Sequence, residues 1–272
     1  MKRLTLIITF AFFLQGAILA QNLFVTLGGG MMNYGGDLQG KTLTFNQAHP
    51  AFTLGGAYYF NGYYGIAYTL TSGKVSGVDA IGIPKHYRRN LSFYSNIGEA
   101  SVTFEANLTD IMNTEKRFTP YAFAGVAAFK MDPYTYDPDG NKTFLQPLST
   151  EGQGLPQYPD KKPYKLSQIA FPFGIGVKYA VSEKIMISAE FSLRKIFTDY
   201  LDDVSGKGYA DTAIINAEKG PLAAKLSFRG DELDPPYILT PKSQRGNPDK
   251  NDVYYTGLIK VSYSFGKSLF SF

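Results

Sequence analysis

The sequence predicts an all-β protein, a closed antiparallel transmembrane β-barrel of about eight strands with short periplasmic turns and long extracellular loops. Three observations support this fold class. The chain begins with a pattern typical of an export signal. Eight later segments alternate apolar and polar residues with the two-residue period of a β-strand. The connections between those segments alternate between short and long, which fits a barrel whose two ends face different compartments.

The N-terminus has the features of a secretory signal peptide. Lys2 and Arg3 supply positive charge, Leu4–Leu14 form an apolar run, and small residues precede the expected cleavage site. A transmembrane anchor is the alternative, but the run is shorter than the roughly 20 apolar residues that a spanning helix needs. We therefore expect residues 1–20 to be a signal peptide and residues 21–272 to form the outer-membrane barrel.

Eight segments have the alternation of a half-buried strand, and their apolar faces are rich in Tyr and Phe. In one of them, Phe171, Phe173 and Ile175 alternate with small or polar residues. Because successive strand residues point to opposite faces, each segment presents one aromatic face and one polar face. The predicted strands are Asn22–Tyr34, Ala51–Phe60, Tyr63–Ser72, Leu91–Leu108, Thr119–Lys130, Ser167–Ala180, Ile185–Thr198 and Val253–Phe265.

The connections fall into two classes that alternate along the chain. The short ones are residues 61–62, 109–118 and 181–184. The long ones are residues 35–50, 73–90, 131–166 and 199–252. The dipeptide Asn61-Gly62 is typical of a tight hairpin. An even number of strands places both termini of the chain on the short-turn side, which we assign to the periplasm.

The faces opposite the aromatic residues carry charged side chains, and these decide between a membrane barrel and a soluble one. A soluble barrel or sandwich, the alternative fold, needs an apolar interior, because unpaired charges are costly to bury. We expect an interior network in which opposite charges pair and fill the lumen as a structural plug. A small gated pore is the alternative. The residues are Glu99, Glu105, Lys178, Glu190, Arg194 and Lys260.

Composition excludes several classes of function. The chain has no cysteine, which rules out disulfides, thiolate metal sites and a cysteine nucleophile. The formal net charge is +4, and removal of Lys2 and Arg3 with the signal peptide lowers it to +2. The basic residues are scattered along the chain and form no stripe, so no nucleic-acid partner is predicted.

Side chains that carry out catalysis are also sparse. His49 and His86 lie in predicted loops, and neither has the spacing to a serine and a carboxylate that a known hydrolase motif requires. Asp199, Asp202 and Asp203 cluster after the seventh strand, where three carboxylates can bind Ca²⁺. A solvated or arginine-paired rim is the preferred interpretation of these aspartates. We therefore predict no catalytic residue, no cofactor and no metal.

The segment at the end of the seventh strand resembles a known family. Residues Arg194–Ser205 look like the signature of a small outer-membrane barrel family of Bacteroidota that includes the PorG barrel of the type IX secretion system. Its signature loop corresponds to Asp199, Tyr200, Asp202 and Asp203. Further pieces agree in order, at residues 33–38, 89–93, 105–107 and 120–125.

The resemblance implies a non-enzymatic protein, integral to the outer membrane, that anchors or organises the type IX secretion machinery. Its implied partners are outer-membrane lipid and periplasmic ring proteins or lipoproteins. The alternatives are a small porin, a surface-ligand-binding barrel and a barrel enzyme acting on lipid. We expect periplasmic partners to contact the largest short turn, through Asp110, Asn113, Glu115, Lys116 and Arg117.

Overall fold

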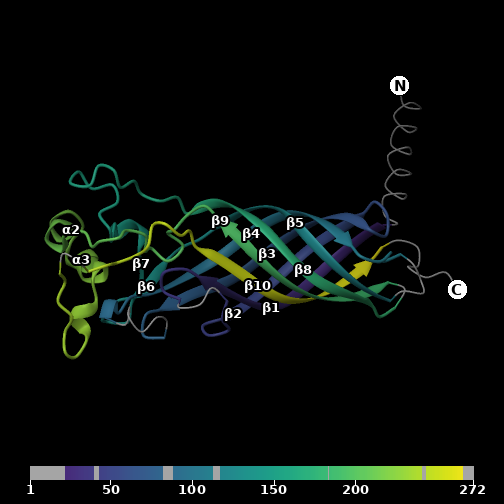
Figure 1. Cartoon of the computed structure of the whole chain (residues 1–272), viewed down its shortest axis with the longest axis horizontal. Helices are drawn as coiled ribbons and strands as arrows, with labels where there is room; N and C mark the ends of the chain where they lie inside the picture. The colour runs from purple at the N-terminus through teal and green to yellow at the C-terminus, as the bar shows by residue number, and fades with distance from the viewer. Residues whose placement is uncertain are drawn as a thin grey trace, which may run out of the picture.

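The structure is a computed structural model that describes residues 22–39, 43–81, 88–112, 117–182, 184–240 and 243–265. Eight strands of the described residues form a closed antiparallel barrel (Figure 1). They are β1 (Leu23–Gly35), β2 (His49–Tyr59), β3 (Tyr64–Val78), β4 (Ser92–Asn107), β5 (Phe118–Lys130), β8 (Ser167–Ala180), β9 (Ile185–Ile196) and β10 (Val253–Ser264). The ring closes where β1 pairs with β10. The predicted fold class is confirmed; the predicted signal peptide lies outside the described residues.

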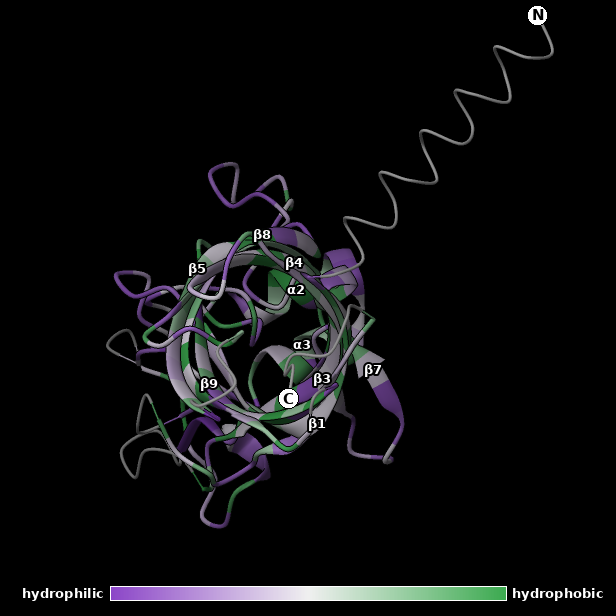
Figure 2. Cartoon of the chain, turned by 90° about the vertical axis from the view of Figure 1, so that its right-hand side faces the viewer, coloured by the Kyte–Doolittle hydropathy of each residue, from purple (hydrophilic) through white to green (hydrophobic). Residues whose placement is uncertain are grey.

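The wall of the barrel is apolar outside and polar inside, the reverse of a soluble barrel. Leu27 and Ile175 point outward and are 65% and 67% exposed, whereas the inward Lys178 and Arg194 are each 4% exposed. Figure 2 looks along the barrel and shows the strands closing around its interior. Each of the eight wall strands is paired on both sides, so the wall exposes no unpaired backbone edge to lipid. The protein is an integral outer-membrane β-barrel.

An aromatic girdle surrounds the short-turn end of the barrel, where β1 begins and β10 ends (Figure 1). Its members are outward-facing and exposed: Phe60, Tyr63, Tyr64, Phe118, Tyr179, Tyr263 and Phe265. Aromatic rings prefer the boundary between hydrocarbon and water, so the girdle marks the periplasmic edge of the bilayer. Tyr59, in the same stretch of sequence, instead points inward and is buried.

The turn between β2 and β3 is longer than the predicted two residues. β2 ends at Tyr59 and β3 begins at Tyr64. The side-chain oxygen of Asn61 accepts hydrogen bonds from the backbone N–H groups of Tyr63 and Tyr64, both at 2.9 Å. The asparagine therefore satisfies the turn through its side chain, a common alternative to a tight backbone hairpin.

Two of the long loops contain secondary structure that the sequence pattern did not predict. The loop after β5 holds a small hairpin, β6 (Tyr134–Tyr136) and β7 (Lys142–Phe144), and the 3₁₀ turn η3 (Gln146–Leu148). The loop after β9 holds helices α2 (Thr212–Lys219) and α3 (Pro221–Ser227) and the 3₁₀ turn η4 (Gly230–Glu232). No helix in the described part of the chain has the length and apolar character needed to cross a bilayer.

The interior of the barrel is layered. A lower apolar cluster near the periplasmic end includes Phe24, Ala57 and Met186. A larger upper cluster extends from the wall into the loops and includes Phe93 and Ile196. The charged side chains lie between these clusters. The sequence pattern had suggested a lumen that is polar along its whole length, but the structure has apolar layers at both ends of the charged one. Apolar packing above and below separates the charges from both aqueous compartments.

Candidate functional site

Six charged side chains project from four strands into the middle of the barrel. They are the side chains that the sequence placed on the inner face: Glu99, Glu105, Lys178, Glu190, Arg194 and Lys260. They form three ion pairs, each between an acidic and a basic residue of different strands. Groups that are far apart in sequence, up to 95 residues, meet because the closed wall brings β4 opposite β8 and β9.

The pair between Arg194 and Glu99 is bidentate. Arg194 Nε donates to Glu99 Oε2 and Nη2 donates to Oε1, both at 3.0 Å. The hydroxyl of Tyr254 donates to Glu99 Oε2 at 2.6 Å, and Arg194 Nη1 donates to Thr256 Oγ1 at 2.7 Å. The two parallel hydrogen bonds fix the relative orientation of the guanidinium and carboxylate planes. With the contacts of Tyr254 and Thr256, the pair connects β4, β9 and β10.

The other two pairs lie closer to the periplasmic end. Lys178 Nζ donates to Glu105 Oε2 at 2.6 Å and also to the side-chain oxygen of Asn107 at 2.9 Å. Lys260 Nζ donates to Glu190 Oε2 at 2.6 Å. The hydroxyl of Tyr121 donates to the same Glu190 oxygen at 2.8 Å, and its ring lies under Lys178, with the ammonium 4.0 Å from the ring centre. The two pairs are therefore linked through one aromatic side chain.

Little space remains around these groups. A gap of about 30 Å³ lies among Glu105, Tyr121, Lys178 and Lys260, which is room for about one water molecule. An eight-strand barrel has an interior just wide enough for its side chains to fill. The charged and aromatic side chains around this gap therefore pack closely against one another.

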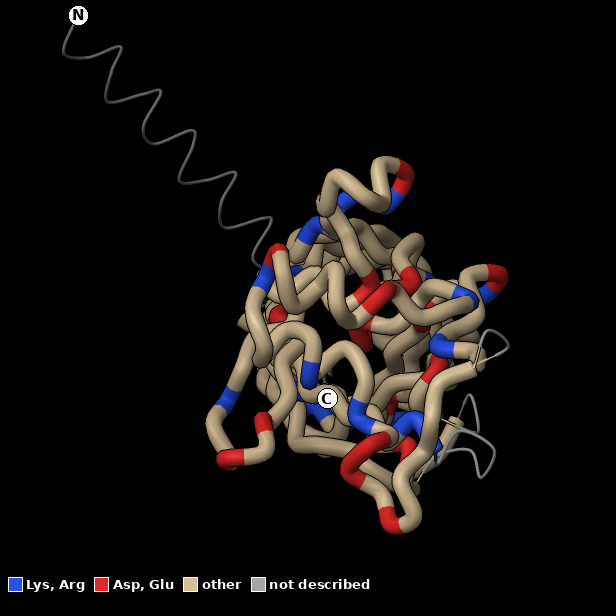
Figure 3. The backbone as a smooth tube through the Cα atoms, turned by 90° about the vertical axis from the view of Figure 1, so that its left-hand side faces the viewer, with Lys and Arg blue, Asp and Glu red and all other residues tan. Residues whose placement is uncertain are grey.

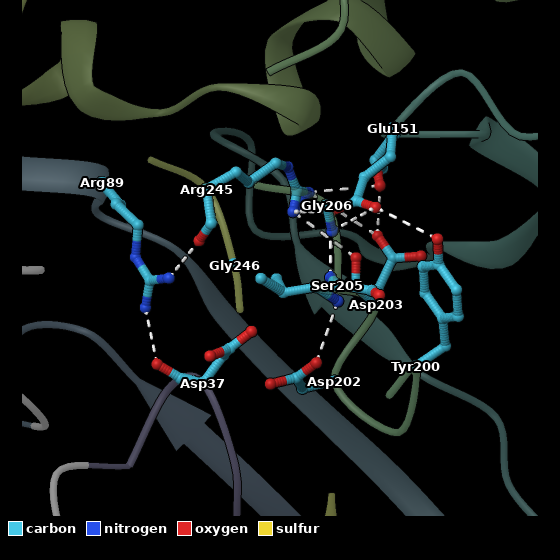
Figure 4. A network of polar contacts seen from close by, with 12 residues as sticks. Asp37, Arg89, Glu151, Tyr200, Asp202, Asp203, Ser205, Gly206, Arg245 and Gly246 are labelled. Atoms are coloured by element: carbon cyan, nitrogen blue, oxygen red, sulfur yellow. Dashed lines mark hydrogen bonds and ion pairs between the residues drawn. The ribbon is translucent and has the colours of Figure 1, made fainter. Parts of the chain in front are cut away.

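The long loops fold back over the extracellular mouth and form a cap. Figure 3 looks onto this end and shows acidic and basic residues along the loops. Figure 4 shows the centre of the cap, where residues from all four loops converge. The guanidinium of Arg245 is buried there, Nη1 donates to Glu151 Oε1 at 3.3 Å, and Nη2 lies 3.9 Å from an oxygen of Asp203. A buried, paired arginine at this position ties the loops after β5 and β9 together.

Glu151 and Arg89 are further centres of the cap. Sequence reasoning did not single out Glu151, and it noted Arg89 only as part of the family resemblance at residues 89–93. Glu151 is fully buried, and its carboxylate accepts the backbone N–H groups of Ser205 and Gly206, both at 3.0 Å. Arg89 pairs with Asp79 at 2.5 Å and donates to the backbone oxygen of Asp37 at 2.8 Å. The contacts of Glu151 join the third and fourth loops, and the contact of Arg89 with Asp37 joins the second loop to the first (Figure 4).

The four residues of the signature loop lie in this cap. Tyr200 donates its hydroxyl hydrogen to Glu151 at 3.2 Å. Asp203 accepts hydrogen bonds from Thr150 and, at 2.6 Å, from the hydroxyl of Tyr164. Asp202 accepts from the hydroxyl of Tyr34 and from the backbone N–H of Val204. Asp199 is buried beside them. Their contacts are those of a scaffold that holds the loops in place.

The acidic residues of the cap do not converge as metal ligands do. Asp203 is directed to Arg245 and Asp202 to Tyr34. Among the residues that the structure describes, no group of three or more acidic or histidine side chains is placed to hold a metal ion. Of the three aspartates of this cluster, Asp203 is the one that lies beside an arginine, and Asp202 instead bonds to Tyr34 and to the backbone of Val204.

Burial raises the pKa of two aspartates of the signature loop, Asp199 and Asp203. It raises the pKa of Asp199 to about 8, and the negative charges of Asp37 and Glu151 act in the same direction. It also raises the pKa of Asp203 to about 6, against the opposing charge of Arg245. The neutral form of Asp199 is therefore the stable one in the folded cap at neutral pH.

The predicted periplasmic contact residues are only partly described. Asp110 is half-buried and accepts a hydrogen bond from the backbone N–H of Met112 at 2.8 Å, so it stabilises its own turn. Arg117 is exposed at the end of the turn. Asn113, Glu115 and Lys116 lie outside the described residues, and so does His86.

The second histidine makes a contact that the sequence did not indicate. His49 Nε2 lies 2.8 Å from the hydroxyl oxygen of Ser76. A hydrolytic triad also needs a carboxylate that orients the imidazole. No carboxylate among the described residues bonds to this ring, and Ser76 is buried. This pair therefore lacks the third member that a serine hydrolase requires.

The comparisons with known proteins begin with a family model. The model of a domain of unknown function, DUF6089, matches residues 2–216. The chain belongs to the DUF6089 family. In this DUF6089 chain the matched part includes β1 to β9 and the signature loop and ends within α2. No curated protein sequence matches it.

Several solved outer-membrane barrels are similar to the DUF6089 chain. Neisserial surface protein A is 10% identical, with 90% of this chain and 97% of that chain covered and a TM-score of 0.43. Ail, the attachment invasion locus protein of Yersinia pestis, in complex with a heparin analogue, is 8% identical, with 89% and 96% covered and a TM-score of 0.42. OprG of Pseudomonas aeruginosa is 8% identical, with 90% and 96% covered and a TM-score of 0.39. At these values the likeness carries no argument about function.

Proposed function

We propose that this protein is a non-enzymatic structural barrel that anchors a periplasmic component of the type IX secretion machinery to the outer membrane. The observation that carries the structural role is the closed lumen. Three ion pairs fill the middle of the barrel, and an ordered cap covers its mouth. A barrel blocked in this way transports no solute, so its function rests on its rims. The sequence resemblance of Arg194–Ser205 to the family that includes PorG supports the link to secretion.

The periplasmic rim is the surface we assign to the secretion partner. Its described members include Asp110 and Arg117, which present opposite charges next to the aromatic girdle. A standard interface buries about 800 Å² on each partner, more than a turn of this length offers. The proposed contact therefore extends from the turn at residues 109–118 onto neighbouring turns and girdle side chains.

Photo-cross-linking in cells tests this assignment. A photoreactive residue at Arg117 should capture a periplasmic ring protein or a lipoprotein of the machinery. The matched control is the same residue at Asp139, an exposed position in the β6–β7 turn on the opposite side of the membrane. Equal capture from both positions, or from neither, contradicts the assignment.

A deletion strain tests the secretion role separately. Without the gene, type IX cargo should accumulate in the periplasm, and the intact gene should restore export. Normal export in a strain without a paralogue contradicts the secretion role. The barrel assignment is independent of that result, because it rests on the closed, inverted sheet.

The alternative function is that of a small porin or a surface-ligand-binding barrel. A porin requires a continuous aqueous path, and the ion pairs at 2.6 Å between Lys178 and Glu105 and between Lys260 and Glu190 oppose it. A surface ligand would bind the cap, which is built from buried polar contacts that hold one loop arrangement. Stable single-channel currents from the purified barrel would favour the porin over the anchor.

A further inference from the structure

A shallow groove crosses the lipid-facing wall in the extracellular half of the barrel. Its volume is about 950 Å³, and it is lined by residues of β1 to β5 and β8, most of them outward-facing, and by Lys165 before β8. Apolar side chains dominate it, with Phe52 and Leu70 on one side and Ile169 on the other. A groove of this composition, in hydrocarbon, suits an acyl chain.

Small residues form the floor of the groove. Ala100 lies next to Leu70 on one neighbouring strand and next to Ala128 on the other. Gly98, two residues further up β4, has open space where a side chain would lie, with no atom within 4 Å of an added Cβ. The outer surface is therefore recessed here relative to the bulky side chains on either side, and a neighbouring lipid molecule can occupy the space.

Two lysines stand at the extracellular end of the groove. Lys130 is the strand partner of Gly98 and, on its other side, of Ser167. Lys165 precedes Ser167 by two residues and lines the same groove. Both lysines are exposed, and neither forms an ion pair with a described residue. Two unpaired cations at the end of an apolar groove match the charge of a phosphorylated lipid headgroup.

The acidic groups nearby do not neutralise these lysines. Glu99 lies between Gly98 and Ala100 in the sequence but points inward to Arg194. Asp132, two residues after Lys130, accepts hydrogen bonds from the backbone and side-chain nitrogens of Asn96 at 2.6 and 3.0 Å. Neither carboxylate forms an ion pair with Lys130 or Lys165, so both ammonium groups are free to meet an anion.

We propose that this groove binds one phosphorylated glycolipid of the lipid A type from the outer leaflet. An acyl chain lies over Gly98, Ala100 and Ala128, and a phosphate is held by Lys130 and Lys165. Lys130 ends β5 and Lys165 lies two residues before β8, so both lie at the long-loop end of the wall and meet the headgroups of the outer leaflet. Among anionic lipids, the phosphorylated glycolipid is the one that this leaflet presents. The proposal depends on the barrel's place in the membrane and is independent of the secretion role.

Native mass spectrometry of the full-length barrel in detergent tests the proposal. The probes are hexa-acylated lipid A, the same lipid without phosphates, and phosphatidylglycerol. We expect retention of one lipid A molecule per barrel and at least tenfold weaker binding of the other two. The double variant Lys130→Gln and Lys165→Gln should weaken lipid A binding at least tenfold.

The matched control is Lys195→Gln. Lys195 is also exposed on the outer wall, at the extracellular end of β9, but does not line the groove. It should leave lipid A binding unchanged. Gly98→Leu and Ala100→Phe each fill the groove, and each should abolish retention of lipid A. Two variants are used so that a folding failure of one is not decisive. Heat-dependent gel mobility checks that each variant is folded.

Three results would overturn the proposal. Equal binding of the dephosphorylated lipid would remove the role of the lysines. Equal binding of phosphatidylglycerol would replace the glycolipid with any anionic lipid. Loss of binding in the Lys195→Gln variant to the same degree would show general attraction to the rim in place of a site.

Discussion

Replacing Arg194 by alanine should destabilise the barrel strongly. The guanidinium is buried and makes both hydrogen bonds of a bidentate pair with Glu99, whose side chain is 0% exposed. Removal of one partner from a buried ion pair costs about 3–5 kcal/mol, because the other charge remains without compensation. Glu99 keeps the hydrogen bond from Tyr254, which offsets part of the cost. We therefore expect a loss of about 3 kcal/mol in the free energy of unfolding, the lower end of that range.

Urea unfolding of the barrel refolded into phospholipid vesicles measures this change. The chain has no tryptophan, so far-UV circular dichroism and heat-dependent gel mobility are the suitable signals. The variant Arg194→Met with Glu99→Met removes both charges and should recover most of the loss, because apolar residues of similar volume can replace a buried pair. The control is Lys207→Ala, which breaks an exposed pair with Asp249 and should have no measurable effect.

An unchanged unfolding free energy in Arg194→Ala would refute the reasoning. It would mean that water in the lumen solvates Glu99 as well as the arginine does. A double variant that is less stable than Arg194→Ala would also contradict it, since the uncompensated charge is the stated cause.

Three further predictions follow from the lumen, the topology and the cap. The purified barrel should show no stable conductance in planar bilayers, and steady open channels would contradict the closed lumen. A cysteine at Asp139 should react with an impermeant maleimide on whole cells and one at Asn61 should not; the reverse pattern would invert the topology. The cap should lose stability as the pH rises from about 4 to about 8, because the folded pKa of Asp199, about 8, exceeds the unfolded value of about 3.9. Limited proteolysis of the cap should detect this loss, and Asp199→Asn should flatten the pH profile; an unchanged slope in that variant would assign the effect to other groups.

The wall of the barrel was predictable from the sequence because its physics is local. Alternation with a period of two assigns each residue to a face, and a membrane leaves only closed sheets as stable solutions. The eight wall strands lie close to the predicted ranges. β3 is the main exception: it extends to Val78 beyond the predicted Ser72, because Val75 and Gly77 continue to pair with β4 above the apolar belt.

The pairing inside the lumen was not predictable from the alternation. The pattern places Glu99 and Arg194 on the inner face, but their meeting depends on the tilt and stagger of the closed sheet. The contacts within the cap were even harder to predict from the sequence. The partners Arg245 and Glu151 are 94 residues apart in different loops, and no periodicity marks either. A weak signal existed for α2, where Asp211 precedes the helix and accepts a hydrogen bond from the backbone N–H of Ala213.

The position of β10 has a consequence for biosynthesis. This last strand supplies the closing partner of β1 and of β9, and it also supplies Lys260 and Tyr254, which satisfy the carboxylates of Glu190 and Glu99. A nascent chain that lacks it has two unpaired strand edges, and its Glu190 has lost the ion-pair partner Lys260. Such a chain cannot settle into the bilayer as a smaller barrel. Premature termination before residue 253 should therefore yield a chain for periplasmic proteases, with no shortened form accumulating in the membrane.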